Sequence, residues 1–424
     1  MRTAPTVRID RSIRRSLQAF DRDRLRWLDE ASALGPLTGL GFGPSTVWVL
    51  SDPDAARTML VTDAESWTRP PATRIPIRLG VGENLFTQSD KAWALLQPQV
   101  APAFRKRALD ARLADLADLI EAEVAALPTR QTIDLGAATS RLALIVAAWV
   151  LAGERLDRDR ADELVDHQRQ IVTWVGHRLS TVRAAVPVAF GKAARAMRSH
   201  RRVLEDYGDE LITRARQRQA SEHDVLDALI AARPGGRSLR PAALRAHLLG
   251  LFFAGNETTA AALSWALVHG ARNPNEWTRL AVEPERAPLF VNETLRLTPA
   301  VWGLTRSPTR RGVTLQAGDH TVSVRRTEVV TVYLRAANRR ASTWPDPLRF
   351  APDRHLATDP QPSRALLAYG LGPRGCIGQH LATAEMTTAL PILARHGNIA
   401  IDDDVTEDAS FALRVAGGLR GRFV

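Results

Sequence analysis

Residues 241–271 read PAALRAHLLGLFFAGNETTAAALSWALVHGA, a helical stretch that is apolar on nearly all sides. Such a helix has no face suited to water, so other elements must surround it. The chain has 424 residues, of which 45% are hydrophobic, and can bury a core large enough to do so. We therefore predict a large fold with this helix at its centre. The polar run at residues 255–259, in the middle of the helix, needs a separate explanation.

Helical spacing of apolar residues dominates the rest of the chain, whereas strand-like patterns are confined to residues 37–50, 313–334 and a short piece near 398–402. The predicted fold class is mainly α with a minor β region. A doubly wound nucleotide-binding fold would instead alternate strands and helices. The other helices that we predict are 20–34, 53–62, 90–104, 107–127, 136–152, 159–178, 189–219, 223–232, 275–282, 286–297 and 378–396.

No low-complexity linker and no repeat divides the sequence, so we predict one domain over residues 1–424, in which residues 1–20 form an N-terminal arm. The N-terminus lacks the apolar core of a signal peptide, and no segment has about 18 uninterrupted apolar residues. We expect no membrane anchor, a cytoplasmic location and a monomer.

The formal net charge is +11, from 57 lysines and arginines against 46 acidic residues, and almost all the positive charge is arginine. A basic balance of this size is compatible with a nucleic-acid ligand or an acidic protein partner. The positive charges are scattered through amphipathic helices, and no zinc-finger, helix-turn-helix or aromatic–basic pattern is present. We therefore expect no nucleic-acid binding, and an ordinarily solvated basic surface.

The sequence GLGPRGC at residues 370–376 has two interpretations. Gly370, Gly372 and Gly375 match the G-x-G-x-x-G dinucleotide fingerprint, which would make the protein a nicotinamide dehydrogenase. That fingerprint opens its domain, however, and only about fifty residues follow here. Alternatively, the glycines clear space around Cys376, so that a thiolate can approach the face of a large planar cofactor.

Two features beside Cys376, the only cysteine in the chain, favour the thiolate interpretation. A predicted helix begins after Gly378, and a helix N-terminus would lower the pKa of the thiol. Arg374 lies two residues before Cys376 and could reach an anionic edge of the cofactor. Core filler and catalytic nucleophile are the other uses open to a single cysteine.

The stretch YGLGPRGCIG resembles the cysteine-ligand loop F-G-x-G-x-R-x-C-x-G of the cytochrome P450 superfamily, with Tyr369 in place of phenylalanine. Three companion motifs stand in the family's order: AGNETT at residues 254–259, ETLR at residues 293–296 and FAPDR at residues 350–354. The resemblance implies a single P450-type domain with haem b between the long central helix and the cysteine loop. It also implies monooxygenation, with Cys376 as the axial ligand of the haem iron.

The resemblance assigns roles to individual residues. Glu257 and Thr258 are the matching positions for proton delivery to iron-bound dioxygen, although a polar run of this kind could also be a packed helix with Thr258 bonded back to a carbonyl. Gln97 departs from the arginine or histidine common at its position, so haem propionates would depend on Arg374 and Arg306. The remaining implied cofactor contacts are Trp93, Tyr369, Gly370, Ala254 and Gly255, and the implied buried structural network is Glu293, Arg296 and Arg354.

The segments that the resemblance places around the substrate are the loop 70–83, the helix near 168–178, and residues 246–258, 299–304 and 408–413. Their apolar side chains predict a bulky, largely apolar small molecule, and we expect secondary metabolism. The pocket residues that we predict are Ile75, Ile77, Trp174, Phe253, Ala254, Val301, Trp302 and Phe411.

Two electrons must come from outside, because no flavin or iron–sulfur segment is fused to the chain. We expect a ferredoxin and a ferredoxin reductase, docking on the basic run Arg105, Lys106 and Arg107, which could also be a merely solvated helix junction. The alternative with the same haem chemistry is oxidative C–C or C–N coupling. A more remote alternative is a haem-binding sensor without turnover.

Overall fold

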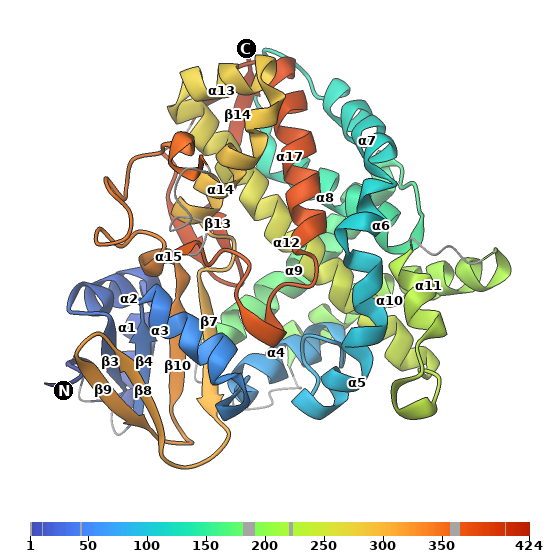
Figure 1. Cartoon of the computed structure of the whole chain (residues 1–424). Helices are drawn as coiled ribbons and strands as arrows, with labels where there is room; N and C mark the ends of the chain where they lie inside the picture. The colour runs from blue at the N-terminus through green and yellow to red at the C-terminus, as the bar shows by residue number, and fades with distance from the viewer. Residues whose placement is uncertain are drawn as a thin grey trace.

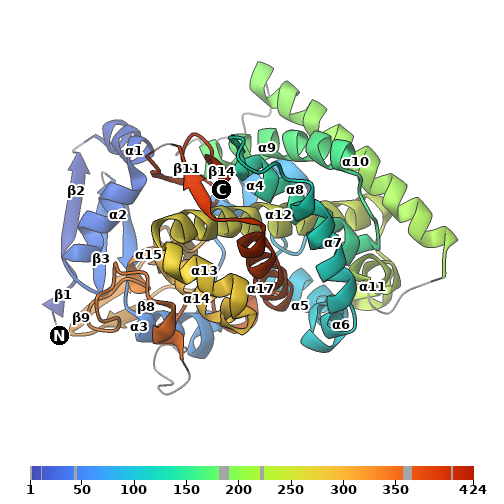
Figure 2. The same ribbon diagram turned by 90° about the horizontal axis from the view of Figure 1, so that it is seen from above.

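The computed structural model describes residues 2–10, 12–42, 45–180, 191–219, 224–356, 365–402 and 404–424. Helices fill most of the molecule, and β3, β4, β8, β9 and β10 lie on one side of it together with α1 and α2, whereas β13 and β14 lie among the helices (Figures 1 and 2). The predicted mainly α class with a minor β region is confirmed. The helices are α1 Ile13–Arg22, α2 Arg24–Ala33, α3 Pro53–Arg57, α4 Pro71–Val81, α5 Asp90–Val100, α6 Lys106–Asp110, α7 Leu113–Ala125, α8 Leu135–Ala152, α9 Arg158–Ser180, α10 Lys192–Gln217, α11 Val225–Ala231, α12 Pro241–Arg272, α13 Pro274–Val282, α14 Ala287–Leu297, α15 Leu334–Ala337 and α17 Gln379–His396.

The largest sheet has the order β2-β3-β4-β10-β7-β5 and joins segments that are distant in the sequence. β10 pairs in parallel with β4, with Val330 opposite Trp48, and antiparallel with β7, with Val330 opposite Arg306. The strands are β1 Arg2–Thr3, β2 Thr6–Asp10, β3 Leu37–Phe42, β4 Ser45–Leu50, β5 Trp67–Thr68, β6 Ile133–Asp134, β7 Gly303–Pro308, β8 Val313–Ala317, β9 His320–Val324, β10 Val329–Tyr333, β11 Ile399–Ile401, β12 Glu407–Ala409, β13 Leu413–Val415 and β14 Arg420–Phe423.

The helix α12 is the central helix that the sequence predicts. In Figure 2 it lies in the middle of the helical part, with α8 and α9 on one side and α13, α14 and α17 on the other. Both α12 and α8 are rich in alanine, which lets them pack closely, and the hydroxyls of Thr139 and Ser264 meet between them at 2.8 Å. By length and composition α8 could cross a membrane, but 72% of it is buried inside the protein, as in a core helix.

Several predicted boundaries are wrong for local reasons. Residues 20–34 belong to two helices, because Asp23 leaves helical geometry at φ −147° and its side chain accepts the N–H of Arg26 at 3.2 Å. The predicted loop 70–83 is largely α4, which begins with proline at the first helical position. The strand β7 escaped prediction because GLTRSP lacks apolar alternation. Residues 2–10 and 12–20 form β1, β2 and most of α1.

A buried ion network holds α14 to the chain after β10. Glu293 and Arg296 are 0% exposed, and Arg296 donates to both oxygens of the Glu293 carboxylate, at 2.7 and 2.9 Å. Arg354 donates to the same carboxylate at 3.0 Å, so the three residues predicted as a network lie together. His355 adds a ring nitrogen at 2.9 Å. Burial alone would raise the pKa of Glu293, but the bonds from Arg296, His355 and the Ala351 N–H lower it to about 2.

The network also supports the segment that precedes Cys376. Arg296 donates to the carbonyl of Asn338 at 2.9 Å, and the Asn338 side-chain oxygen accepts the N–H of Leu367 at 3.1 Å. Because the pKa of Glu293 is lowered from 4.5 to about 2, the stabilisation by its carboxylate is present above about pH 4.5 and is lost as the pH falls toward 2. At neutral pH the carboxyl group of Glu293 is therefore ionised.

Glu293→Gln is expected to lower the free energy of unfolding by about 3–5 kcal/mol, because it leaves the fully buried Arg296 and the mostly buried Arg354 without their carboxylate. A urea titration at pH 7, followed by far-UV circular dichroism, measures the change. Arg279→Gln is the matched control, because Arg279 is 38% exposed and pairs with Glu283 at 3.3 Å, so it should cost under about 1 kcal/mol. Equal effects of the two variants would contradict a stabilising role for the network.

Candidate functional site

The loop around Cys376 is closed by its own backbone. The N–H of Cys376 donates to the carbonyl of Tyr369 at 2.9 Å, and the N–H of Gly375 donates to the carbonyl of Gly372 at 2.9 Å. The loop leads into α17, which begins at Gln379, and no strand precedes it within the described residues 365–369. The dinucleotide interpretation of the three glycines is therefore wrong, because their loop does not connect a strand to a helix.

Two of the glycines are required by backbone geometry. Gly370 and Gly372 have positive φ values of 68° and 71°, which side chains rarely adopt. A Cβ on Gly372 would lie 1.9 Å from the carbonyl oxygen of Leu60, and one on Gly370 would lie 3.2 Å from Leu304. The glycines therefore let the loop pack directly on the turn after α3 and on β7.

Cys376 is an exposed residue, but protein atoms surround much of its thiol. The residue is exposed, yet burial by the surrounding protein raises the pKa of its thiol, and the N–H of Gly378 lowers it by a smaller amount. The amide N–H at the start of α17 therefore lowers the pKa of the thiol, as expected, but desolvation has the larger effect, so the pKa is raised overall. A coordinated metal ion would instead lower the pKa of the thiol, since metal-bound thiols are deprotonated.

On α12, the predicted oxygen-activation segment offers one partly open face. Ala254, Gly255 and Thr258 are half-exposed and share this face, whereas Glu257 and most of the flanking helix are buried. A Cβ on Gly255 would meet only Ala147, at 4.0 Å. The Thr258 hydroxyl donates to the Ala254 carbonyl at 2.8 Å, the back-bonded arrangement that remained open from the sequence.

The neighbouring polar residues of the segment are held by the protein. Asn256 donates to the carbonyl of Ser140 at 2.6 Å and accepts from Gln168 at 3.2 Å, so it joins α12 to α8 and α9. Glu257 forms an ion pair with Arg414 of β13. Burial raises the pKa of Glu257 and outweighs the attraction of Arg414. The pair therefore holds a carboxyl group that takes up a proton more readily than an exposed glutamate.

Arginines gather at the edge of the site next to α5. Arg374 forms an ion pair with Asp90 and stacks on Trp93, with its guanidinium carbon 4.0 Å from the ring centroid. Its Nη1 is buried and has no hydrogen-bond partner among the described residues. Burial, together with the charge of Arg374, lowers the pKa of Arg306 to about 10 and that of Arg69 to about 9. The cluster therefore has more positive than negative charge.

Trp93 and Gln97 are one turn apart on α5, and both are half-buried. Trp93 thus contacts the arginine cluster directly, through Arg374. Tyr369 lies behind the cysteine loop, where its hydroxyl meets that of Thr383 at 2.9 Å. Burial raises the pKa of Tyr369 to about 12.

The predicted pocket residues divide into two groups. Ile77, Trp174, Phe253 and Phe411 belong to one apolar cluster formed by α4, α9, α12 and residue 411, in which the rings of Phe253 and Phe411 lie 4.7 Å apart. The other four lie elsewhere: Ala254 is on the partly open face of α12, Ile75 is 38% exposed, Val301 packs on the sheet core, and Trp302 packs beside α2, with the Arg24 guanidinium 5.4 Å from its ring.

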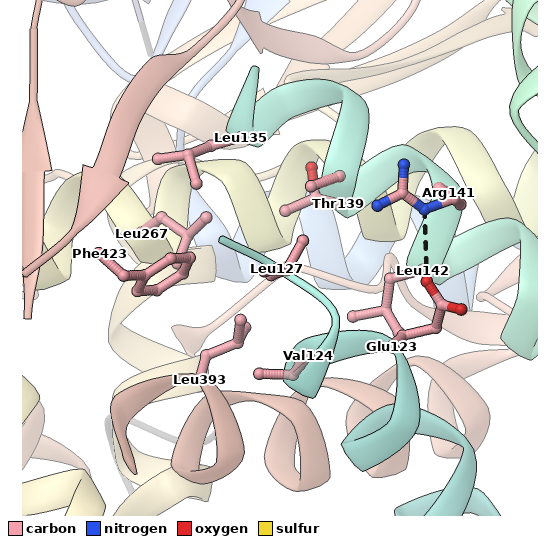
Figure 3. Close-up of a pocket in the computed structure, with 11 residues that line it drawn as sticks. Glu123, Val124, Leu127, Leu135, Thr139, Arg141, Leu142, Leu267, Leu393 and Phe423 are labelled. Carbon is pink, nitrogen blue, oxygen red and sulfur yellow. Dashed lines mark hydrogen bonds and ion pairs between the residues drawn. The ribbon is translucent and has the colours of Figure 1, made fainter. Parts of the chain in front are cut away.

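Figure 3 shows a separate apolar cavity between α7, α8, α12 and α17. It has a volume of about 20 Å³, which is room for about one water molecule, and five of its eleven lining residues are leucines. The ion pair between Arg141 and Glu123, at 3.3 Å, lies at its edge. It contains none of the predicted site residues, so we regard it as a packing defect of the core.

Four residues of the site and its support were missed from the sequence: Arg69, Arg414, His355 and Asn338. His355 directly follows a motif arginine, which is a weak signal. Arg69, Arg414 and Asn338 gave no signal in the sequence, because their contacts join chain segments that are far apart. Arg414 of β13, for example, contacts α12.

The residues present fit a haem. The accessible thiol matches an iron ligand, and the open helix face at Gly255 matches a flat apolar ring. The cationic cluster, in which one buried N–H has no partner among the described residues, matches two carboxylates. Cys376 would ligate the iron, and Arg69, Arg306 and Arg374 would neutralise the carboxylates.

Comparisons with known proteins agree with this fit. A crystal structure of a six-coordinated cytochrome P450 from Thermus thermophilus has the same fold, with a TM-score of 0.76 and 22% sequence identity over 95% of this chain and 98% of that chain. Cyclooctatin synthase of Streptomyces melanosporofaciens is 28% identical over 88% of this chain and 85% of its own length.

Putative cytochrome P450 137 of Mycobacterium tuberculosis is 32% identical, but the match covers only 46% of this chain and 41% of the relative. The chain thus spans less than half the length of this relative. The cytochrome P450 family model, by contrast, matches residues 24–412, which is nearly the whole chain. The chain therefore belongs to the cytochrome P450 family, which implies a haem-iron cofactor, dioxygen and a source of electrons.

Proposed function

We propose that the protein is a haem-thiolate monooxygenase that uses haem b to hydroxylate or epoxidise a small molecule. The observation that carries the proposal is the accessible Cys376 thiol, held in a glycine-shaped loop beside buried arginines with too few anionic partners. When bound, the haem supplies an iron centre at which dioxygen is activated, and a thiolate ligand favours O–O cleavage.

The chain's own residues would orient the substrate and deliver protons. The Thr258 hydroxyl can rotate away from the Ala254 carbonyl and donate on the open face of α12. Glu257 has a raised pKa and can carry a proton once its ion pair with Arg414 opens. The open face at Gly255 leaves room for a small molecule beside the helix backbone.

The substrate that we propose has a bulky apolar part, because Ile77, Trp174, Phe253 and Phe411 meet in one cluster. A place in secondary metabolism is supported by two relatives from Streptomyces. They are cyclooctatin synthase and a 20-oxo-5-O-mycaminosyltylactone 23-monooxygenase of Streptomyces fradiae, which is 32% identical over 55% of this chain and 54% of the relative. Product analysis would distinguish oxygen insertion from C–C or C–N coupling, which the same centre could perform.

The electron donor that we propose is a ferredoxin, reduced by a ferredoxin reductase, with the enzyme as a cytoplasmic monomer. Arg105, Lys106 and Arg107 are exposed at the start of α6, and α6 packs against α17, where His380 is also exposed. Arg374 contributes little to this surface, because it is 12% exposed and paired with Asp90. An acidic donor would thus dock on the side of the cysteine loop.

Cys376→Ala is expected to abolish the long-wavelength Soret band of the dithionite-reduced carbon monoxide complex, because no other thiol can ligate the iron. Difference spectroscopy measures the band, and Thr258→Ala, which leaves the ligand intact, should retain it. A Cys376→Ala protein that kept the band would overturn the proposal.

Thr258→Ala is expected to uncouple the enzyme, so that reductant is consumed while hydrogen peroxide is released in place of product. Glu257→Gln should slow turnover by about 100- to 10,000-fold, the scale of general acid–base catalysis. Reductant, peroxide and product are measured together. Thr259→Ala, on the adjacent buried position, is the control with wild-type coupling expected. Wild-type coupling in all three variants would exclude this segment from proton delivery, and reductant consumption without product under every condition would favour a sensor.

Reduction of the protein by a ferredoxin is expected to slow steeply as salt is added, because electrostatic steering is screened. Arg105→Glu with Arg107→Glu should slow reduction about 10-fold or more at low salt, measured by stopped flow. Arg15→Glu with Arg26→Glu makes the same charge change at arginines that are 69% and 63% exposed near the N-terminus. If both pairs slow reduction equally, the donor docks elsewhere.

A further inference from the structure

Arg74 of α4 is an arginine without a partner beside the arginine cluster. It is half-buried, its Nε is shielded from solvent, and no described residue accepts a hydrogen bond from it or forms an ion pair with it. Its charge acts on both Arg69 and Arg374. Nothing in its contacts explains why a cation is kept at this position.

The arginines in this region outnumber the carboxylates that pair with them. Arg69, Arg74, Arg306 and Arg374 carry four positive charges, and among the described residues Asp90 is the one carboxylate that pairs with any of them. Two haem carboxylates would bring the negative charges to three. One positive charge is left over, and Arg74 is the arginine of the four that has neither an ion pair nor a hydrogen bond to the protein.

The position of Arg74 connects the cationic cluster to the apolar cluster. Ile77 and Val81 follow Arg74 at helical spacing of three and seven residues, and both are buried with Phe253. The start of α4 is fixed to β7 by the hydroxyls of Thr73 and Thr305, which are 2.7 Å apart. A ligand lying along this face of α4 would have its apolar part on the Ile77 side and its end at Arg74.

We propose that Arg74 binds the carboxylate of an otherwise apolar substrate, so that the substrate is an amphipathic acid. This inference rests on the proposed function, because the acid would be held for oxidation at the haem. A guanidinium group offers two parallel N–H donors to a carboxylate, and such charge-assisted pairs are strong where water is excluded. The pair would fix which end of the molecule stays away from the reacting centre.

The test uses the haem protein and two series of probes with increasing chain length. The first series is ω-(imidazol-1-yl)alkanoic acids, and the second is 1-alkylimidazoles, which lack the carboxylate. Imidazole ligation of the iron shifts the Soret band, so spectral titration gives a dissociation constant for each probe. The acids are expected to bind about 10- to 100-fold more tightly than the neutral probes at the chain length that reaches Arg74.

Arg74→Gln should remove this advantage of the acids and leave the affinity of the neutral probes unchanged. Arg74→Lys should keep part of it. Arg78→Gln is the matched control, because Arg78 lies one turn later on α4 and is 57% exposed in an ion pair with Glu83 at 3.2 Å. It should change neither series.

Three results would overturn the inference. Acids and neutral probes could bind equally at every chain length, or Arg74→Gln could weaken both series alike. Arg74→Gln could also lower the haem content per protein, which would assign Arg74 to the haem carboxylates. A protein that shows no Soret band would instead overturn the proposed haem function, so the two failures are distinguishable.

Discussion

The buried ion pair between Glu293 and Arg296 supports the rest of the site. Arg296 also donates hydrogen bonds to the carbonyls of Asn338, Pro347 and Arg349, so one guanidinium fixes three points of the chain that follows β10. Asn338 then holds Leu367, which begins the approach to the cysteine loop. Because a buried charge tolerates no loss of its partners, the loop is held in place by the same interactions that stabilise the core.

The cysteine loop in turn depends on small residues. Gly372 lies against the backbone of Leu60, and Gly370 lies against Leu304 of β7, the strand that also carries Arg306. A side chain at Gly372 would clash with the Leu60 carbonyl, and one at Gly370 would crowd the Leu304 side chain. The loop geometry and the arginine cluster therefore depend on the same strand, because β7 contacts Gly370 through Leu304 and also carries Arg306.

The sequence predicted well whatever depends on local spacing. The central helix was recognisable because it is apolar on nearly all sides, whereas Glu293 and Arg296 were singled out by the resemblance to the P450 motifs, and their i and i+3 spacing adds only that they share a helix face. Pairings between distant segments were not predictable. β7 has the composition of a turn and becomes a strand only because β10 offers it hydrogen bonds. Arg414 lies 157 residues after Glu257, and no local pattern marks them as partners.

Prediction of the thiol pKa was incomplete for a different reason. The amide N–H of Gly378, the residue before α17, does lower the pKa of the Cys376 thiol. Desolvation of the thiol is the larger effect and has the opposite sign. A site that combines an exposed thiol with arginines that outnumber their carboxylate partners suits a group that brings both a metal cation and carboxylates. One group with both properties satisfies the loop and the arginine cluster together, whereas a free metal ion or a free acid would satisfy only one of them.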